Sequence, residues 1–244
     1  MRDAEHAGVV WLTRTQPEGG GALAAALEEA GWTVLPLPVL QIEPLALDAA
    51  AMADLQRHIP MADYIVWTSA HAVGAVPATW FANCPPEALH AVGARTAQAA
   101  ARHLGRSVYH PQNGHGGMAW INDIRNRWRA GQRVLVLTGV DGRSDWHTAI
   151  RDAGLMLTVV PLYRRRPRLV TLPPQDPVAV IATSGAALQA MLDCRPSVAA
   201  RHRPLLLPAA RLTAEARRGL WSGRILPMPD LSPAAVLTAL ESCR

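Results

Sequence analysis

Lysine, phenylalanine and paired cysteines are missing or scarce in this chain of 244 residues. All 24 basic side chains are arginine, and there is one phenylalanine. The cysteines Cys84, Cys194 and Cys243 lie far apart and form no CxxC pair, which is typical of a reducing compartment and not of a disulfide framework. No stretch approaches the roughly 18 uncharged apolar residues of a membrane span, and the start, with two acids before its first apolar run, does not resemble a secretory signal. These features predict a soluble cytoplasmic protein.

Several well-known catalytic and cofactor motifs are also missing. The sequence contains no GxxxxGKS/T phosphate loop, no GxGxxG after a strand, no HExxH and no GxSxG, so nucleotide, hydride, zinc and acyl-transfer chemistry lose their usual sequence support. The closest group among nine histidines is His103, His110 and His115, and its spacing matches no standard metal site. We therefore expect neither a metal nor a cofactor.

The arginines give the chain a formal net charge of +5 and a pI of about 9.8. Two explanations are open. Guanidinium groups bind carboxylate or phosphate in bidentate fashion and would suit a polyanionic ligand; alternatively, a GC-rich genome favours arginine codons and most of these side chains decorate solvated faces. Binding to nucleic acid is not expected, because the basic residues are spread along the chain without a recognisable motif.

A series of short blocks occurs twice, in residues 8–125 and again in residues 131–244. The repeat is marked by Thr15 with Thr138, Gly31 with Gly154, Ser69 with Ser184, Thr96 with Thr213, and Gly105 with Gly223. Each block has a short apolar run followed by apolar residues at helical spacing, which predicts a strand and then a helix. The expected α/β fold is two similar domains of flavodoxin-like or Rossmann-like type, with parallel sheets covered by helices and a ligand-binding cleft between them.

The predicted elements follow these blocks. Strands are expected at 9–12, 33–40, 64–68, 134–137, 157–162 and 178–181 and ending at 93, and helices at 23–30, 96–104, 146–153 and 213–221 and after Ser69 and Ser184. Pro36 and Pro38 exclude the segment 33–40 from the centre of a sheet, so it is an edge strand or a connector.

Prolines crowd two equivalent places in the repeats, around Pro38 and around Pro167. If both places are extended connectors, the chain crosses between the domains twice, and one domain contains both ends of the sequence. The expected organisation is a discontinuous domain of residues 1–35 and 167–244, a second domain of residues 41–157, and connector strands at 36–40 and 158–166.

Hydroxyl residues follow several predicted strands: Thr68, Ser69, Thr96, Thr183, Ser184 and Thr213. In an open parallel sheet, ligands bind beyond the carboxyl ends of the strands, where helix N-termini favour anions. Each hydroxyl alone has a simpler explanation as a helix cap. Their matched positions in the two repeats favour a receptor for carboxylate or phosphate groups.

Tyr163 ends the predicted strand 157–162 beside three consecutive arginines. A phenol at this place could donate a proton to a leaving group; packing as an amphipathic residue against the connector is the alternative. We interpret Arg164, Arg165 and Arg166 as a solvated run and Gly114–Gly117 as a turn in preference to an anion-binding loop.

Eight stretches, in order along the chain, carry a resemblance to a known family. They are VVWLTR, DYIVWTSAHAV, HAVGARTAQAA, GQRVLVLTG, AGLMLTVVPLYRRRP, VAVIATSGAAL, LTAEARRG and DLSPAAVLTAL. In this order they resemble the uroporphyrinogen-III synthase family. The resemblance implies two α/β domains joined by a two-stranded connector, in a cofactor-free, cytoplasmic enzyme that works as a monomer.

The resemblance also implies a reaction. Hydroxymethylbilane, handed over from hydroxymethylbilane synthase, would lose water and close to uroporphyrinogen III with its terminal pyrrole inverted, a carbon–oxygen lyase step in haem, sirohaem and cobalamin biosynthesis. The alternative that the same sequence pattern allows is a non-catalytic, two-lobed binding protein for a polyanionic small molecule.

Site residues follow from the resemblance, position by position. Tyr163 matches the family's proton donor, and the implied substrate-binding residues are Arg14, Ser69, Thr96, Gly139, Ser184, Gly185 and Thr213. Two positions depart from the pattern. Thr15 stands where a proline commonly follows the arginine, and Ala210 stands where the first repeat has Gly93.

Overall fold

The structure, a computed structural model, describes residues 8–13, 21–140, 142, 144–228 and 231–242. Its contacts divide the chain into two compact units. Unit 1 comprises Met1–Gln41 and Arg166–Arg244, and unit 2 is the continuous segment Ile42–Arg165. The chain therefore passes from one unit to the other twice.

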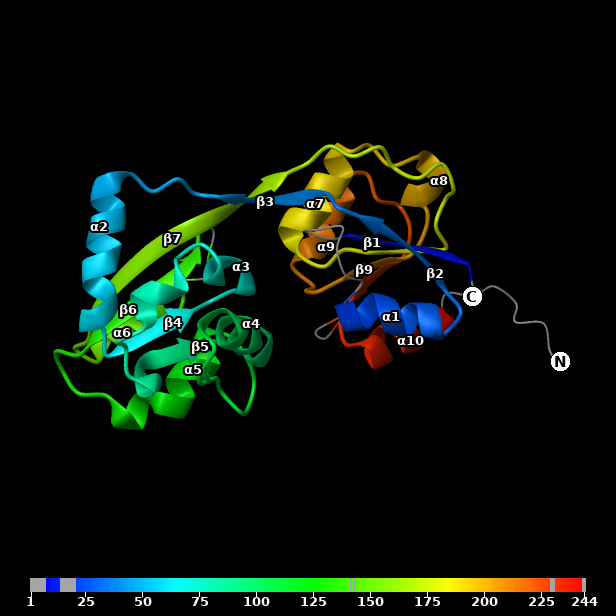
Figure 1. Cartoon of the computed structure of the whole chain (residues 1–244). Coiled ribbons are helices and arrows are strands. Elements are labelled where there is room, and N and C mark those ends of the chain that lie inside the picture. Colours follow the sequence, from blue (N-terminus) through cyan, green and yellow to red (C-terminus); the bar gives the residue numbers. More distant parts are fainter. Residues whose placement is uncertain (1–7, 14–20, 141, 143, 229–230, 243–244) are drawn as a thin grey trace. The chain divides into compact units, whose positions relative to one another are not determined.

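Unit 1 is built on a five-stranded sheet with the strand order β10-β9-β8-β1-β2, and its neighbouring strands are parallel. Its elements are β1 (Val9–Thr13), α1 (Gly21–Glu29), β2 (Thr33–Leu37), β8 (Ala179–Ile181), α7 (Gly185–Asp193), α8 (Val198–Arg201), β9 (Leu205–Leu207), α9 (Leu212–Arg218), β10 (Ile225–Pro227) and α10 (Pro233–Glu241). Side chains alternate across a strand. Trp11 of β1 therefore packs with α7 and α9 on one face of the sheet, and Leu12 packs with α1 and α10 on the other (Figure 1).

Unit 2 contains a second five-stranded sheet, with the order β3-β7-β6-β4-β5. Its elements are β3 (Leu40–Pro44), α2 (Ala49–His58), β4 (Tyr64–Trp67), α3 (Ala70–Val73), β5 (Leu89–Ala91), α4 (Ala94–Leu104), α5 (Gly117–Ile124), β6 (Arg133–Gly139), α6 (His147–Asp152) and β7 (Met156–Pro167), with short 3₁₀ turns η1 (Ile59–Met61), η2 (Ala78–Phe81), η3 (Pro86–Ala88) and η4 (Arg125–Arg127). Trp67 of β4 packs with α3 and α4, and Val66 packs with α5 and α6 on the opposite face.

The two sheets share a strand order, which confirms the predicted pair of similar parallel α/β domains. The order β2-β1-β8-β9 in unit 1 corresponds to β7-β6-β4-β5 in unit 2. The place of β10 is taken in unit 2 by a single parallel bridge between His90 of β5 and Tyr109. Helices cover both faces of each sheet because alternate residues of the central strands are apolar on both sides.

The predicted strand 33–40 corresponds to β2, which ends at Leu37, and a further strand, β3, begins at Leu40. Each lies at the edge of its sheet, as the prolines require, because a proline cannot donate a hydrogen bond to a second neighbouring strand. Pro36 lies opposite Leu12 of β1. Strand β7 continues to Pro167 instead of ending at residue 162, since β3 runs beside it (Figure 1).

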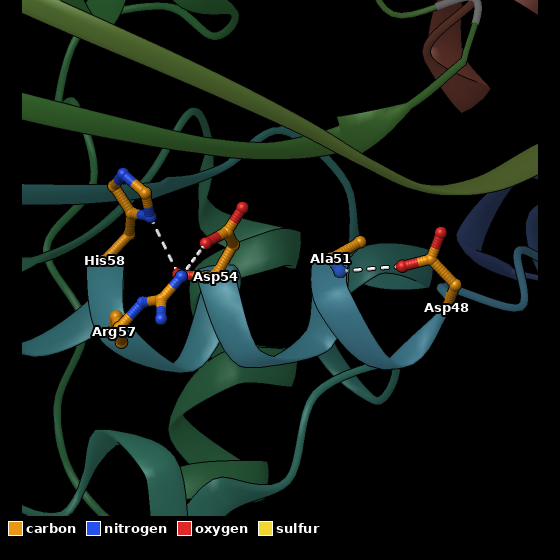
Figure 2. Close-up of polar contacts among 5 residues, drawn as sticks. All are labelled: Asp48, Ala51, Asp54, Arg57 and His58. Atoms are coloured by element: carbon orange, nitrogen blue, oxygen red, sulfur yellow. Dashed lines mark hydrogen bonds and ion pairs between the residues drawn. The ribbon is translucent and has the colours of Figure 1, made fainter.

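Helix α2 was not predicted from the sequence, and polar contacts define its exposed side (Figure 2). Asp48 is its N-cap, and the carboxylate accepts a hydrogen bond from the backbone N–H of Ala51 at 2.8 Å. Further along the helix, Asp54 forms an ion pair with Arg57, and its backbone oxygen lies 2.7 Å from Nδ1 of His58. Leu55 is the buried residue of this helix, so the apolar face on which sequence prediction depends is small.

Candidate functional site

The candidate site lies in unit 2, at the edge of the sheet where the parallel strands β4, β6 and β7 direct their carboxyl ends. Ligands of open α/β sheets bind at such an edge. A pocket of about 300 Å³ is present here, and its polar side chains come from Thr68, His115, Thr138, Asp145, Tyr163 and Arg165. Three glycines at positions 116, 117 and 142 also form part of its wall.

Tyr163 is placed at the pocket by an irregularity in the sheet. The register of β6 against β7 shifts between Thr138 and Gly139, so that Gly139 lies opposite Tyr163. The phenol ring rests on this glycine, because a Cβ there would lie 2.7 Å from Cζ of the tyrosine. A larger residue at position 139 would therefore displace the ring.

Two side chains border the phenol of Tyr163. Nη2 of Arg165 donates a hydrogen bond to Oη of Tyr163 at 3.2 Å. The ring of His71, in α3, meets the tyrosine ring edge-on with 5.6 Å between centroids. Burial lowers the pKa of His71, and the nearby charges of Arg165 and Arg95 lower it further. The imidazole is therefore uncharged at neutral pH.

The three consecutive arginines differ in environment. Arg166 is exposed, as expected of a solvated run, whereas Arg164 and Arg165 are partly buried and have side-chain partners. Arg164 forms a bidentate pair with Glu43 of β3, with Nε–Oε2 and Nη2–Oε1 distances of 2.9 and 2.7 Å. Arg165 instead contacts Tyr163. The reason is the strand conformation, which sends successive side chains to opposite faces.

A hydroxyl pair joins the ends of β4 and β6. Oγ1 of Thr68 donates to Oγ1 of Thr138 at 2.7 Å, and both residues line the pocket. Unit 1 contains a related contact, in which Oγ1 of Thr183 donates to the backbone oxygen of Thr13 at 3.1 Å. The sequence repeat is thus accompanied by related hydrogen bonds in the two units, each of which joins the ends of two neighbouring strands.

Ser69 and Ser184, two of the predicted hydroxyl residues, are helix caps. Oγ of Ser69 accepts from the backbone N–H of His71 at 3.2 Å at the start of α3. Oγ of Ser184 accepts from the backbone N–H of Ala187 at 3.1 Å at the start of α7. These hydrogen bonds are sufficient to explain why a serine stands at each of these helix starts, because serine is a preferred N-cap residue.

Thr96 and Thr213 were predicted to cap helices, and this prediction is wrong. The N-cap of α4 is Gly93, and that of α9 is Arg211. Both threonines lie inside the first turn of their helices, because the chain enters the helical conformation before it reaches them. Glycine is a common N-cap residue, but the prediction assigned the cap to the nearest hydroxyl residue.

The structure brings together some of the predicted site residues. Tyr163 and Gly139 are in contact in unit 2. Ser184, Gly185 and Thr213 belong to unit 1, where Gly185 lies so close to α9 that a Cβ would stand 3.0 Å from Cδ2 of Leu212. Arg14 lies outside the described residues.

Much of the pocket wall was not predicted. Gly142, Asp145 and Trp146 come from the segment between β6 and α6, which carries no recognisable motif. The segment His115–Gly117 did carry a signal, its glycines, but it was interpreted as a turn. Arg165 could have been found from its spacing, since it lies two residues from Tyr163 on a strand.

The described ranges contain no group of three His, Cys, Asp or Glu side chains arranged to hold a metal ion. None of the helices in the same ranges combines the length and apolar character needed to cross a bilayer.

Known proteins share the sequence pattern and the fold. The family model of uroporphyrinogen-III synthase HemD matches residues 21–218. Uroporphyrinogen-III synthetase from Helicobacter pylori is 17% identical with a TM-score of 0.60, over 97% of this chain and 99% of that one. A mutant uroporphyrinogen III synthase from Thermus thermophilus is 15% identical with a TM-score of 0.52, over 96% and 98% of the two chains. These structures share the fold, and the family match covers most of the sequence. The chain belongs to the uroporphyrinogen-III synthase HemD family.

Proposed function

We propose that the chain converts hydroxymethylbilane to uroporphyrinogen III and water, with the Tyr163 pocket as the reaction site. The observation that carries the function is the family match over residues 21–218. The fold shared with two solved synthases supports it. The pocket at the carboxyl ends of the strands supports the choice of site.

The reaction depends more on the positioning of the substrate than on covalent catalysis by the protein. Protonation of the hydroxymethyl oxygen lets the carbon–oxygen bond break with its electron pair on oxygen, and the adjacent pyrrole nitrogen stabilises the resulting azafulvene cation. The substituted carbon of the last pyrrole attacks this cation to form a spiro intermediate, whose rearrangement closes the ring with that pyrrole inverted. The protein's main task is to hold the two ends of the substrate in the geometry for inversion.

Tyr163 is the proposed proton donor to the departing hydroxyl. Its ring is held against Gly139, and its oxygen lies beside a guanidinium at the pocket wall. The substrate carboxylates are proposed to bind Arg14, Ser69, Thr96, Gly139, Ser184, Gly185 and Thr213. Ser69, Thr96, Ser184, Gly185 and Thr213 lie at helix starts, where backbone N–H groups and the helix dipole favour anions.

The change Tyr163→Phe is expected to lower kcat by roughly 100-fold or more, because a positioned general acid contributes on that scale. The measurement uses enzymatically generated hydroxymethylbilane, with the type I and type III products separated by chromatography. Tyr109→Phe is the matched control, since that phenol bonds to Asp123 and does not line the pocket. An unchanged rate in Tyr163→Phe removes the phenol from the mechanism. Wild-type protein that leaves only type I product, formed at the uncatalysed rate, favours the binding-protein alternative.

The proposed enzyme is a cytoplasmic monomer that receives its substrate from hydroxymethylbilane synthase. Its proposed domains are residues 1–35 with 167–244, and residues 41–157. The segments 36–40 and 158–166 form the proposed two-stranded connector. The unit boundaries after residues 41 and 165 support this division, and sedimentation of the purified chain tests the monomer.

A further inference from the structure

Arg165 and Tyr163 line the same pocket from one strand. They are separated by one position on β7, and side chains two residues apart lie on the same face of a strand. Nη2 of Arg165 lies 3.2 Å from Oη of Tyr163, and Cζ of the arginine lies 5.5 Å from the ring centroid. The positive charge is thus held next to the phenol oxygen.

The chemistry of the two groups sets the direction of this hydrogen bond. A guanidinium has five N–H donors and no acceptor, so Arg165 donates and the oxygen of Tyr163 accepts. The proton of the phenol must therefore point away from the arginine. Within the described residues, no protein group accepts that proton. It is available to a ligand in the pocket.

The phenol is confined from two further sides. Gly139 supports one face of the ring, where a Cβ would come within 2.9 Å of Cε2. His71 meets the ring edge, and this imidazole is uncharged at neutral pH, as described above. Among the described groups in contact with Tyr163, Arg165 therefore supplies the positive charge. Asp145, a further charged side chain among the described residues of the pocket wall, is acidic.

We propose that Arg165 is the positioning residue for proton transfer from Tyr163, an inference that rests on the proposed function. By donating to Oη, Arg165 directs the phenol proton into the pocket. When the substrate's carbon–oxygen bond breaks with its electron pair on oxygen, that proton completes the departing water. Arg165 then stabilises the phenolate that remains. The proton released when the last pyrrole regains aromaticity restores the phenol.

The test compares Arg165→Met and Arg165→Lys, each alone and combined with Tyr163→Phe. Loss of a charge-assisted hydrogen bond is expected to lower kcat of Arg165→Met by roughly 10- to 100-fold, with KM nearly unchanged. The lysine of Arg165→Lys has hydrogen-bond donors and no acceptor atom, as arginine does, so this variant is expected to keep most of the wild-type kcat. In the Tyr163→Phe background, Arg165→Met should cause no further loss, because the arginine acts through the phenol.

Arg164→Met is the matched control, since it removes the same charge from the opposite face of β7. It should retain the wild-type kcat. Circular dichroism checks the folding of each variant, and Arg165→Gln replaces Arg165→Met if the latter does not fold.

Two results overturn the inference alone: full activity of Arg165→Met, or a rise in KM that persists in the Tyr163→Phe background. The second result identifies Arg165 as a direct ligand of a substrate carboxylate. Failure of the proposed function looks different, because the wild-type protein itself then yields only the type I isomer.

Discussion

His90 is a buried side chain of unit 2 whose two ring nitrogens both have hydrogen-bond partners. Nδ1 accepts from the indole N–H of Trp120 at 3.1 Å, and Nε2 lies 2.8 Å from the backbone oxygen of Glu87. This pair of contacts suits the neutral ring, with Nε2 as donor. Burial lowers the pKa of His90 to about 4, and the charge of Arg127 acts in the same direction against the opposing effect of the Glu87 hydrogen bond.

The protein is therefore expected to lose stability as the pH falls below the ordinary histidine pKa of about 6.5. The folded-state pKa of His90 lies below the unfolded value, so the unfolded chain binds the proton more readily. The loss begins near pH 6.5 and is complete below about pH 4, and it reaches about 2 kcal/mol at pH 5. Urea unfolding of wild type and His90→Gln at several pH values measures it. The variant lacks the titrating group, so parallel curves for the two proteins would contradict the assignment.

Helix α2 depends on a local cap more than on buried apolar side chains. Within this helix, Leu55 is the buried residue, whereas the carboxylate of Asp48 holds the first turn (Figure 2). A helix with so little apolar burial has few other contacts to hold its start. Its stability should therefore respond to the cap.

Asp48→Ala is expected to destabilise the protein by about 1 kcal/mol, the usual value for a lost N-cap. Asp54→Ala in the same helix is the control, because its ion pair with Arg57 is exposed and such pairs contribute about 0.5 kcal/mol or less. Thermal unfolding of the three proteins gives the comparison. Equal effects of the two changes would show that the cap has no special importance.

Helix starts also show which local features can be predicted. Ser69 and Ser184 cap their helices as expected, because an N-cap depends on a few neighbouring residues. Thr96 and Thr213 do not, since α4 and α9 begin before them. The exact start of a helix depends on where the preceding strand ends and releases the chain, which is decided by sheet packing.

At the scale of the whole molecule, the formal charge of +5 should assist the binding of a substrate with eight carboxylates. Attraction of this kind is screened by salt, with a Debye length that falls from about 14 Å at 50 mM to about 6 Å at 300 mM. KM is expected to rise several-fold over this range while kcat changes little, because the proposed proton transfer is between groups in contact. Initial rates in sodium chloride measure both constants. A KM that stays constant would show that net charge has no part in binding.

The sequence alone determined the fold class and the repeat, and it predicted the tyrosine that the proposed mechanism uses as proton donor. Strand and helix periodicity and proline placement are local properties of the sequence. Because the sequence contains a repeat, each of these patterns occurs twice and supports the same prediction. The order of eight short stretches then indicated the family without any single strong motif.

Only the tertiary structure decided what surrounds Tyr163. The register shift between Thr138 and Gly139 brings the glycine under the phenol, and the pocket wall includes residues from segments far apart in the chain. The alternation of β7 gives Arg164 and Arg165 different partners, Glu43 and Tyr163. Register and cross-strand contacts depend on which strands become neighbours, and that information is carried by the packed sheet, not by any short stretch of residues.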